Sequence, residues 1–131
     1  MENRYLFRGK RIDNGEWIFG NLIQTDNGAY IIQNYIPQNL LNKYKVMPLT
    51  ICQCTDARDK NGKLMFENDI LSAHLDDKFP EDETRTRVVW HENGWHTKEQ
   101  GSDDYAELDD FDTKYFKVIG NMIDNPELLE V

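Results

Sequence analysis

The chain is short of cysteine and of long apolar runs. Its two cysteines, Cys52 and Cys54, stand two residues apart, which is an awkward spacing for a disulfide, so we expect a reduced, cytosolic environment. The opening residues MENRYLFRGK do not form the apolar stretch of a secretory signal, and no segment has the length and apolar character of a membrane span. The sequence therefore predicts a cytoplasmic protein that has no membrane partner.

Basic residues are also few compared with acidic ones: 15 Lys and Arg stand against 24 Asp and Glu, which gives a formal net charge of −9. Residues 76–112 carry four Lys or Arg against thirteen Asp or Glu, and the rest of the chain is close to balance. An acidic segment of this kind repels nucleic-acid phosphates, which argues against a nucleic-acid partner. Its ordinary interpretation is a solvated face or an exposed loop, and we expect exposed loops at residues 76–84 and 100–112.

What the sequence does contain is a repeated turn, in which an asparagine directly precedes a glycine. Two such residues tolerate positive φ, as the type I′ turn of a two-residue β-hairpin requires. The turns are Asn14-Gly15, Asn27-Gly28, Asn61-Gly62 and Asn93-Gly94.

Runs rich in β-branched and aromatic residues flank these turns, which predicts many short strands. Residues 4–12, 16–24 and 29–36 predict a three-stranded antiparallel meander. Further strands are expected at residues 46–54, 64–75, 85–91, 94–98 and 115–122. Residues 37–48 form a connector, with a possible helical turn at Leu40, Leu41 and Tyr44, and they could also mark a subdomain boundary. A short helix is expected at residues 124–129, where Pro126 follows a capping residue. The fold class is therefore all-β, with one or two short helices and a small barrel rather than a large sandwich.

The sequence contains no constellation of residues that specifies a catalytic or metal site. Asp69 lies among apolar neighbours, and a buried carboxylate must be hydrogen-bonded or paired, so we interpret it as an acceptor for backbone N–H groups. His91 and His96 flank the Asn93-Gly94 turn near several acids, but no recognised metal spacing is present, and His74 stands apart. Cys52 and Cys54 lack a second pair that would complete a zinc site. We therefore predict no catalytic, cofactor-binding or metal-binding residue.

The aromatic and basic residues also favour structural roles. Trp17, Trp90 and Trp95 could form a stacking surface, although tryptophan in a small β protein is more often core or subunit interface. We expect Trp90 in the core and Trp95 partly exposed. Four basic residues give the first strand a positive side that suits the acidic segment, in this or a neighbouring subunit, better than nucleic acid. They are Arg4, Arg8, Lys10 and Arg11.

The stretch from Gln53 to Leu71, QCTDARDKNGKLMFENDIL, resembles a segment of the YopX-like family of phage and prophage proteins, Q-Y-T-G-L-K-D-K-N-G-K-E-I-Y-E-G-D-I-V. An opening F-R-G-K-R-x-D-N-G-E-W and a closing V-I-G-N-x-x-x-N-P-E-L-L, at residues 7–17 and 118–129, are also similar. Cys54 replaces the usual tyrosine, and Asp56 and Asn68 replace the usual glycines. Because asparagine is the residue other than glycine that best tolerates left-handed backbone, the change at Asn68 predicts positive φ there. At position 56, aspartate in place of glycine does not decide whether the backbone bends.

The resemblance implies a mostly β protein with an SH3-like barrel in its C-terminal part and self-association, and it assigns no site residue. We therefore expect a β-meander subdomain at residues 1–48 and an SH3-like barrel subdomain with a short C-terminal helix at residues 49–131. The expected function is that of a phage or prophage accessory protein, a homo-oligomer that is not an enzyme, needs no cofactor and contacts a host or phage protein. Two alternatives remain: an acidic effector that occupies a nucleic-acid-binding protein by charge mimicry, and a small metal-dependent hydrolase.

Overall fold

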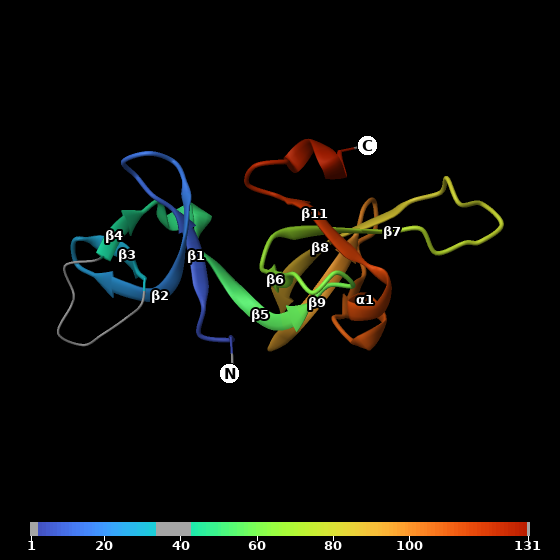
Figure 1. Ribbon diagram of the computed structural model, residues 1–131, viewed down its shortest axis with the longest axis horizontal. Coiled ribbons are helices and arrows are strands. Elements are labelled where there is room, and N and C mark those ends of the chain that lie inside the picture. The colour runs from blue at the N-terminus through green and yellow to red at the C-terminus, as the bar shows by residue number, and fades with distance from the viewer. Residues whose placement is uncertain (1–2, 34–42, 131) are drawn as a thin grey trace. The chain divides into compact units, whose positions relative to one another are not determined.

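The computed structural model describes residues 3–33 and 43–130 and shows an all-β chain, as the sequence predicts (Figure 1). The chain divides into two compact units, Met1–Cys54 and Thr55–Val131, which we name unit 1 and unit 2. The predicted helical turn at Leu40 and Leu41 lies outside the described residues, whereas Tyr44 belongs to a strand. Within the described ranges, no helix is long and apolar enough to cross a membrane.

Unit 1 contains the predicted meander. Each strand pairs antiparallel with the next in the order β1, β2, β3, β4, and β1 also pairs with the start of β5. The end of β1 then bonds back to β4, because Arg11 bridges Val46 and the amide of Met47 donates to the Lys10 carbonyl at 2.8 Å. These bonds close the four strands into a ring. The elements are β1 (Phe7–Lys10), β2 (Trp17–Thr25), β3 (Gly28–Ile32), β4 (Lys43–Val46), the 3-10 helix η2 (Pro48–Thr50) and β5 (Cys52–Arg58).

The ring encloses a small apolar core. Ile18, Ala29, Ile31 and Val46 are buried in it, each from a different position around the ring. Gly20 marks the place where β2 passes from its pairing with β1 to its pairing with β3. A glycine inside a strand often marks such a bend or a close approach of backbone.

Unit 2 is built on a five-stranded antiparallel sheet in the order β10-β9-β8-β7-β11. β5 continues from unit 1 into unit 2, where it neighbours β6. The SH3-like closure expected for residues 49–131 stays a prediction. The remaining elements are β6 (Leu64–Phe66), β7 (Asp69–Ala73), β8 (Thr84–His91), β9 (Gly94–Glu99), β10 (Tyr105–Glu107), α1 (Asp110–Tyr115), β11 (Lys117–Asn121) and the 3-10 helix η3 (Pro126–Leu129).

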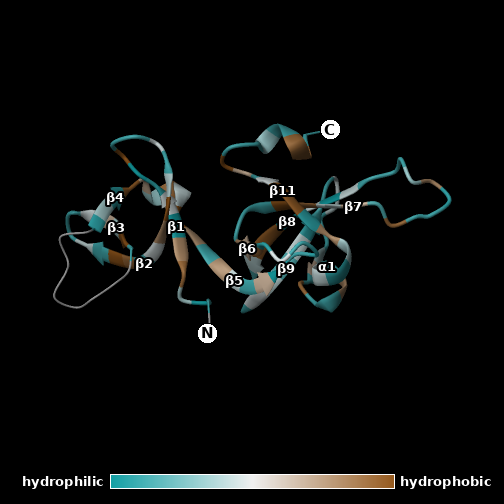
Figure 2. Ribbon diagram, in the orientation of Figure 1, coloured by the Kyte–Doolittle hydropathy of each residue, from teal (hydrophilic) through white to brown (hydrophobic). Residues whose placement is uncertain are grey.

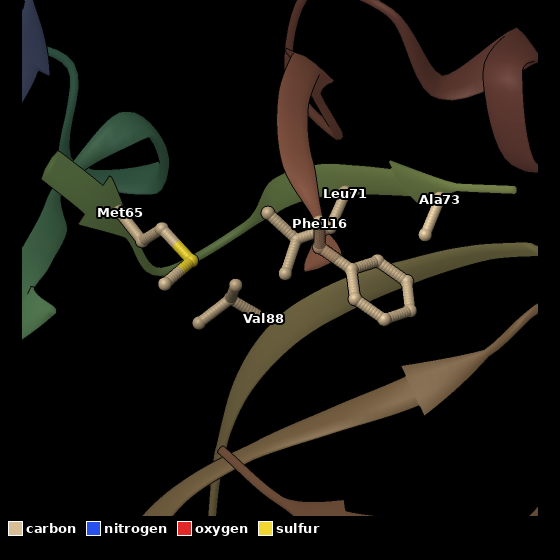
Figure 3. Close-up of a cluster of buried hydrophobic side chains, with 5 residues drawn as sticks. All are labelled: Met65, Leu71, Ala73, Val88 and Phe116. Atoms are coloured by element: carbon tan, nitrogen blue, oxygen red, sulfur yellow. The ribbon is translucent and has the colours of Figure 1, made fainter. Parts of the chain in front are cut away.

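The core of unit 2 lies on one face of this sheet. Figure 3 shows Phe116 beside Leu71 and Ala73 of β7, with Val88 of β8 and Met65 of β6 completing the cluster. All five side chains are buried, and burying a large apolar side chain contributes roughly 1.5–3 kcal/mol. In contrast, the loop of residues 76–83 between β7 and β8 is exposed and mostly hydrophilic, as predicted (Figure 2).

The hairpins form at the predicted places, but the first three turns are not of type I′. At Asn14-Gly15, Asn27-Gly28 and Asn61-Gly62 only the glycine has positive φ. At Asn61-Gly62 the Gly62 amide donates to the Asp59 carbonyl and the Asp59 amide to the Lys63 carbonyl, which is a three-residue loop with the glycine in the bulge position. The fourth turn centres on Glu92 and Asn93, which both have positive φ, so it lies one residue earlier than predicted.

Three other sequence predictions are corrected. Residues 46–54 are not one strand, because Pro48 begins the short helix η2 before β5 starts at Cys52. Residues 64–75 are interrupted at Glu67 and Asn68, where the chain turns from β6 into β7. Residues 100–112 contain β10 and the start of α1 rather than a loop alone. The short helix at the C-terminal end is confirmed, although Asn125 precedes it as the cap residue.

Candidate functional site

The Gln53–Leu71 stretch is held by buried carboxylates that accept backbone N–H groups. Asp69 is 1% exposed, and its Oδ2 accepts from the Phe66 amide at 2.8 Å, as the sequence predicts. Asn68 has φ +73°, which confirms the positive φ predicted there. Asp56, in strand β5, has φ +68°, so the backbone bends at this position as well. The residues of the Gln53–Leu71 stretch thus have structural functions in the bends of the chain.

Asp59 is a second buried carboxylate, and sequence reasoning gave it no role. Its Oδ1 accepts from the amides of Asn61 and Lys63, each at 2.9 Å, and its Oδ2 accepts from the amide of Val118 at 2.9 Å. This one side chain therefore organises the β5–β6 hairpin and fastens it to β11. Both of its oxygens therefore have a structural function.

The histidines and cysteines do not assemble into a reactive site. His91 and His96 lie near each other, with ring centroids 5.6 Å apart, but His91 stacks on Tyr105 and Nδ1 of His96 contacts the Gly94 carbonyl. Cys52 and Cys54 are buried as thiols, and the thiol of Cys52 donates to the Thr50 carbonyl at 3.3 Å. Among residues 3–33 and 43–130, no group of three or more His, Cys, Asp or Glu could hold a metal ion. The hydrolase hypothesis gains no support from this geometry.

The structure separates the three tryptophans. Trp90 is 54% exposed, so the prediction that it is core is wrong: it lies on the face of Val88, but beyond the core, next to the hairpin turn. Trp95 is partly exposed, as predicted, and meets Trp90 edge to face at 5.1 Å between ring centroids. Trp17 lies under the guanidinium of Arg8, at 4.7 Å, on the ring of unit 1.

The basic residues of the first strand make contacts within unit 1. The Arg11 guanidinium bonds the Asp13 carboxylate at 2.6 Å and lies 4.2 Å from the Tyr44 ring. The ammonium group of Lys10 lies 5.5 Å from the ring of Trp17. These contacts are local, between residues close together on the ring.

A groove on unit 2 is the most developed candidate site. It is a cavity of about 460 Å³ lined by strands β8, β9 and β10 of the sheet and by the segment that leads from β10 into α1. Thr84 and Thr86 of β8 and Thr97 of β9 lie on one face of the sheet, because alternate residues of a strand share a face. Phe116, from the apolar core, also lines it. We call this cavity the acidic groove, after five further residues that line it, which are Glu99, Asp104, Glu107, Asp109 and Asp112.

Two buried polar groups in the acidic groove are unusual. The Oγ1 atom of Thr86 is buried without a hydrogen-bond partner, although the residue is only 5% exposed. Asp112 is buried as well, and burial raises the pKa of its carboxyl group, with the nearby carboxylate of Asp109 raising it further. An unpaired buried hydroxyl and a desolvated carboxylate both cost folding free energy. These two groups of the groove therefore lower the free energy of unfolding.

Helix α1 holds the acidic side of the groove. Asp109 caps it by accepting from the Phe111 amide at 3.1 Å, and Asp112 Oδ2 accepts in return from the Asp109 amide at 3.0 Å. This reciprocal pair is a capping box. Lys114 in the last turn places a positive charge at the negative end of the helix dipole. These signals were present in the sequence and could have predicted α1, whereas nothing in the sequence singled out Thr86.

The opposite face of the same sheet carries two neighbouring basic residues. Arg87 of β8 pairs in register with Lys98 of β9, and both line a second cavity of about 360 Å³. Nearby, the guanidinium of Arg85 bonds Glu83 at 2.9 Å and the Leu128 carbonyl at 2.8 Å, while the hydroxyl of Ser72 donates to Glu83. Basic residues therefore line the second cavity, together with Glu99 and Asp103, whereas none lines the acidic groove.

Replacing Glu83 with glutamine should lower the free energy of unfolding by about 0.5–1 kcal/mol at neutral pH, a figure reduced by solvent screening. The bonds from Arg85 and Ser72 lower the pKa of the Glu83 carboxyl group. A lowered pKa stabilises the folded state above the ordinary glutamate pKa of about 4.3, and this stabilisation disappears as pH falls through the folded value. Urea unfolding of both proteins at pH 7 and pH 3 checks this. An equal difference at both pH values would contradict it.

These features define a two-unit, all-β protein with buried structural carboxylates and one acidic groove. A family model described as YopX protein matches residues 6–130, so the chain belongs to the YopX family. No curated protein matches the chain. The crystal structure of protein EF1440 from Enterococcus faecalis is similar in fold, with a TM-score of 0.56 and 21% identity over 95% of this chain and 96% of that one.

Proposed function

We propose that this YopX-family chain is a phage- or prophage-encoded accessory protein that has no enzymatic activity and acts as a homo-oligomer through protein–protein contacts. The observation that carries the proposal is the exposed tryptophan of the β8–β9 hairpin. Trp90 keeps 54% of its surface exposed while it stacks edge to face with Trp95. Tryptophan is enriched in interface cores and depleted from ordinary surface, so such a pair is typical of a contact surface.

Other exposed apolar side chains add to this support. Leu49, in the helix η2 of unit 1, is 94% exposed, and Met47 lies just before it. A protein leaves large apolar side chains in water at a cost that a contact surface removes. The motif residues of the family, in contrast, are used for hairpin geometry, which supports a non-enzymatic function.

Light scattering or analytical ultracentrifugation at tens of micromolar tests the assembly directly. We expect a mass above that of the 15.5 kDa chain. A single monomeric species across that concentration range would contradict the proposal.

Replacing Trp90 with alanine should weaken self-association about thirtyfold, which corresponds to the roughly 2 kcal/mol typical of an interface hot spot. The stability of the isolated chain should change by less than about 1 kcal/mol, because an exposed side chain contributes little to folding. Phe79→Ala is the matched control: Phe79 is 52% exposed but lies in the loop between β7 and β8. Sedimentation of the three proteins checks this, and equal weakening by both substitutions would remove Trp90 from the interface.

A second candidate function is an acidic effector that occupies a nucleic-acid-binding protein. The acidic groove favours it, because five of the thirteen acids of residues 76–112 line this one cavity. A surface of this kind presents negative charge as phosphates do. A variant with these five carboxylates changed to amides should lose such a partner in a pull-down from phage-infected or prophage-induced cells, and retention of the same partner would contradict the idea.

A further inference from the structure

We infer that the acidic groove is a recognition site for the side chain of an arginine presented by a partner protein. The inference takes from the proposed function only the choice of a protein as partner, and it does not depend on self-association. Its basis is the combination of charge, burial and shape found in this one cavity of unit 2.

The charge of the groove has one sign. Five acidic residues line it, of which Glu107 pairs in register with His96 of the opposite sheet face, and the lining includes no Lys, Arg or His. Because the described acids do not gather closely enough to hold a metal ion, the complementary ligand is an extended organic cation. A cation in the groove would also relieve the repulsion between the neighbouring carboxylates of Asp109 and Asp112.

The floor of the groove carries a hydrogen-bonding atom with no partner. Thr86 Oγ1 is buried on the sheet face, with Leu71 and Glu99 opposite it in the register of the neighbouring strands. Buried polar atoms are nearly always paired, so an unpaired hydroxyl that lines a cavity marks a place for a donor or acceptor from outside. A cationic N–H is the donor that agrees with the surrounding charge.

The shape of the lining favours arginine over a simple ammonium ion. Phe111 and Phe116 contribute aromatic surface, which can take both an aliphatic stem and a stacked guanidinium. A guanidinium has five donors in a planar fork, which suits several separate acceptors, such as the Thr86 hydroxyl and the Asp112 carboxylate. Phe111 is 49% exposed, so a protein surface around the arginine would cover it.

The test uses the full chain, labelled with ¹⁵N and titrated with a capped peptide, acetyl-Gly-Ser-Arg-Ser-Gly-amide. We expect saturable amide shifts at Thr86, Thr97 and Asp112. The same peptide with citrulline, the neutral isostere of arginine, should bind at least tenfold more weakly. Equal binding of the citrulline peptide, or shifts that avoid these three amides, would overturn the inference. Binding of free spermidine more tightly than the arginine peptide would overturn the choice of a protein side chain as ligand.

The Thr86→Val variant separates recognition from folding, because its two effects should have opposite signs. Removal of an unpaired buried hydroxyl should raise the melting temperature by about 4 °C. The same change should weaken binding of the arginine peptide at least fivefold. Arg87→Gln is the control, since Arg87 is on the same strand but the opposite face, and its peptide affinity should stay within twofold. Unchanged binding by Thr86→Val would overturn the inference.

The variants also distinguish this inference from the proposed function. Thr86→Val should sediment as the wild-type assembly, whereas Trp90→Ala should keep its affinity for the arginine peptide. If the wild-type chain proves monomeric but binds the peptide, self-association fails and the groove assignment stands. If the chain assembles but ignores the peptide, the groove assignment fails alone.

Discussion

Replacing Asp59 with alanine is expected to lower the free energy of unfolding by about 3 kcal/mol. The buried carboxylate accepts from three backbone amides, those of Asn61, Lys63 and Val118. Alanine removes all three bonds and leaves the three amides without acceptors in a region that water hardly reaches, since Asp59 is only 5% exposed. Hydrogen bonds to a charged acceptor contribute about 1.5–3 kcal/mol each, although the total is less than additive.

Asparagine at this position should cost less, about 1–2 kcal/mol, because its side-chain oxygen can still accept at one side of the hairpin. Asp77→Ala is the control for loss of one negative charge, since Asp77 lies in the exposed loop between β7 and β8 and should change stability by less than about 0.5 kcal/mol. Urea unfolding measures all three variants, and hydrogen exchange of the Val118 amide reports the local bond. Slow exchange of that amide in Asp59→Ala would show that Asp59 does not fasten β11.

The positions of the turns and the role of Asp69 could be predicted from sequence because each depends on short-range chemistry. An Asn-Gly pair tolerates the positive φ of a tight turn wherever it stands, and an acid among apolar neighbours requires donors. The turn types were not predictable in the same way. Loop length is set by which residues pair across the hairpin, and at the fourth turn the pairing of His91 with Gly94 moved the loop to Glu92 and Asn93.

The acidic groove could not be predicted because it depends on contacts between distant segments. Thr86 becomes a groove residue only through the register that places Leu71 on one side of it and Glu99 on the other. The exposure of Trp90 has a similar origin. It shares a face with the buried Val88, but the strand extends past the core that covers that face. Periodicity tells which residues share a face, and it does not tell where the covering layer ends.

Replacing Gly20 with alanine is expected to destabilise unit 1 by about 3 kcal/mol or more. A Cβ atom at this position would lie 2.2 Å from the Ile32 carbonyl oxygen and 2.8 Å from its carbon. Both atoms belong to backbone, so no rotation of a side chain can relieve the overlap. β2 or β3 must move instead, at the point where β2 changes partner and the ring of unit 1 bends.

Gly94→Ala supplies the matched control for this substitution. A Cβ at Gly94 would make only an ordinary contact, 3.4 Å from a ring carbon of His96, and Gly94 is not among the glycines with positive φ. It should change stability by less than about 0.5 kcal/mol. Hydrogen exchange at the Ile31 and Ile32 amides reports the effect in unit 1, and urea unfolding measures the change in stability. If Gly20→Ala keeps both amides protected as in the wild type, β2 and β3 have room to separate there. The close approach of β2 and β3 would then not require glycine at position 20.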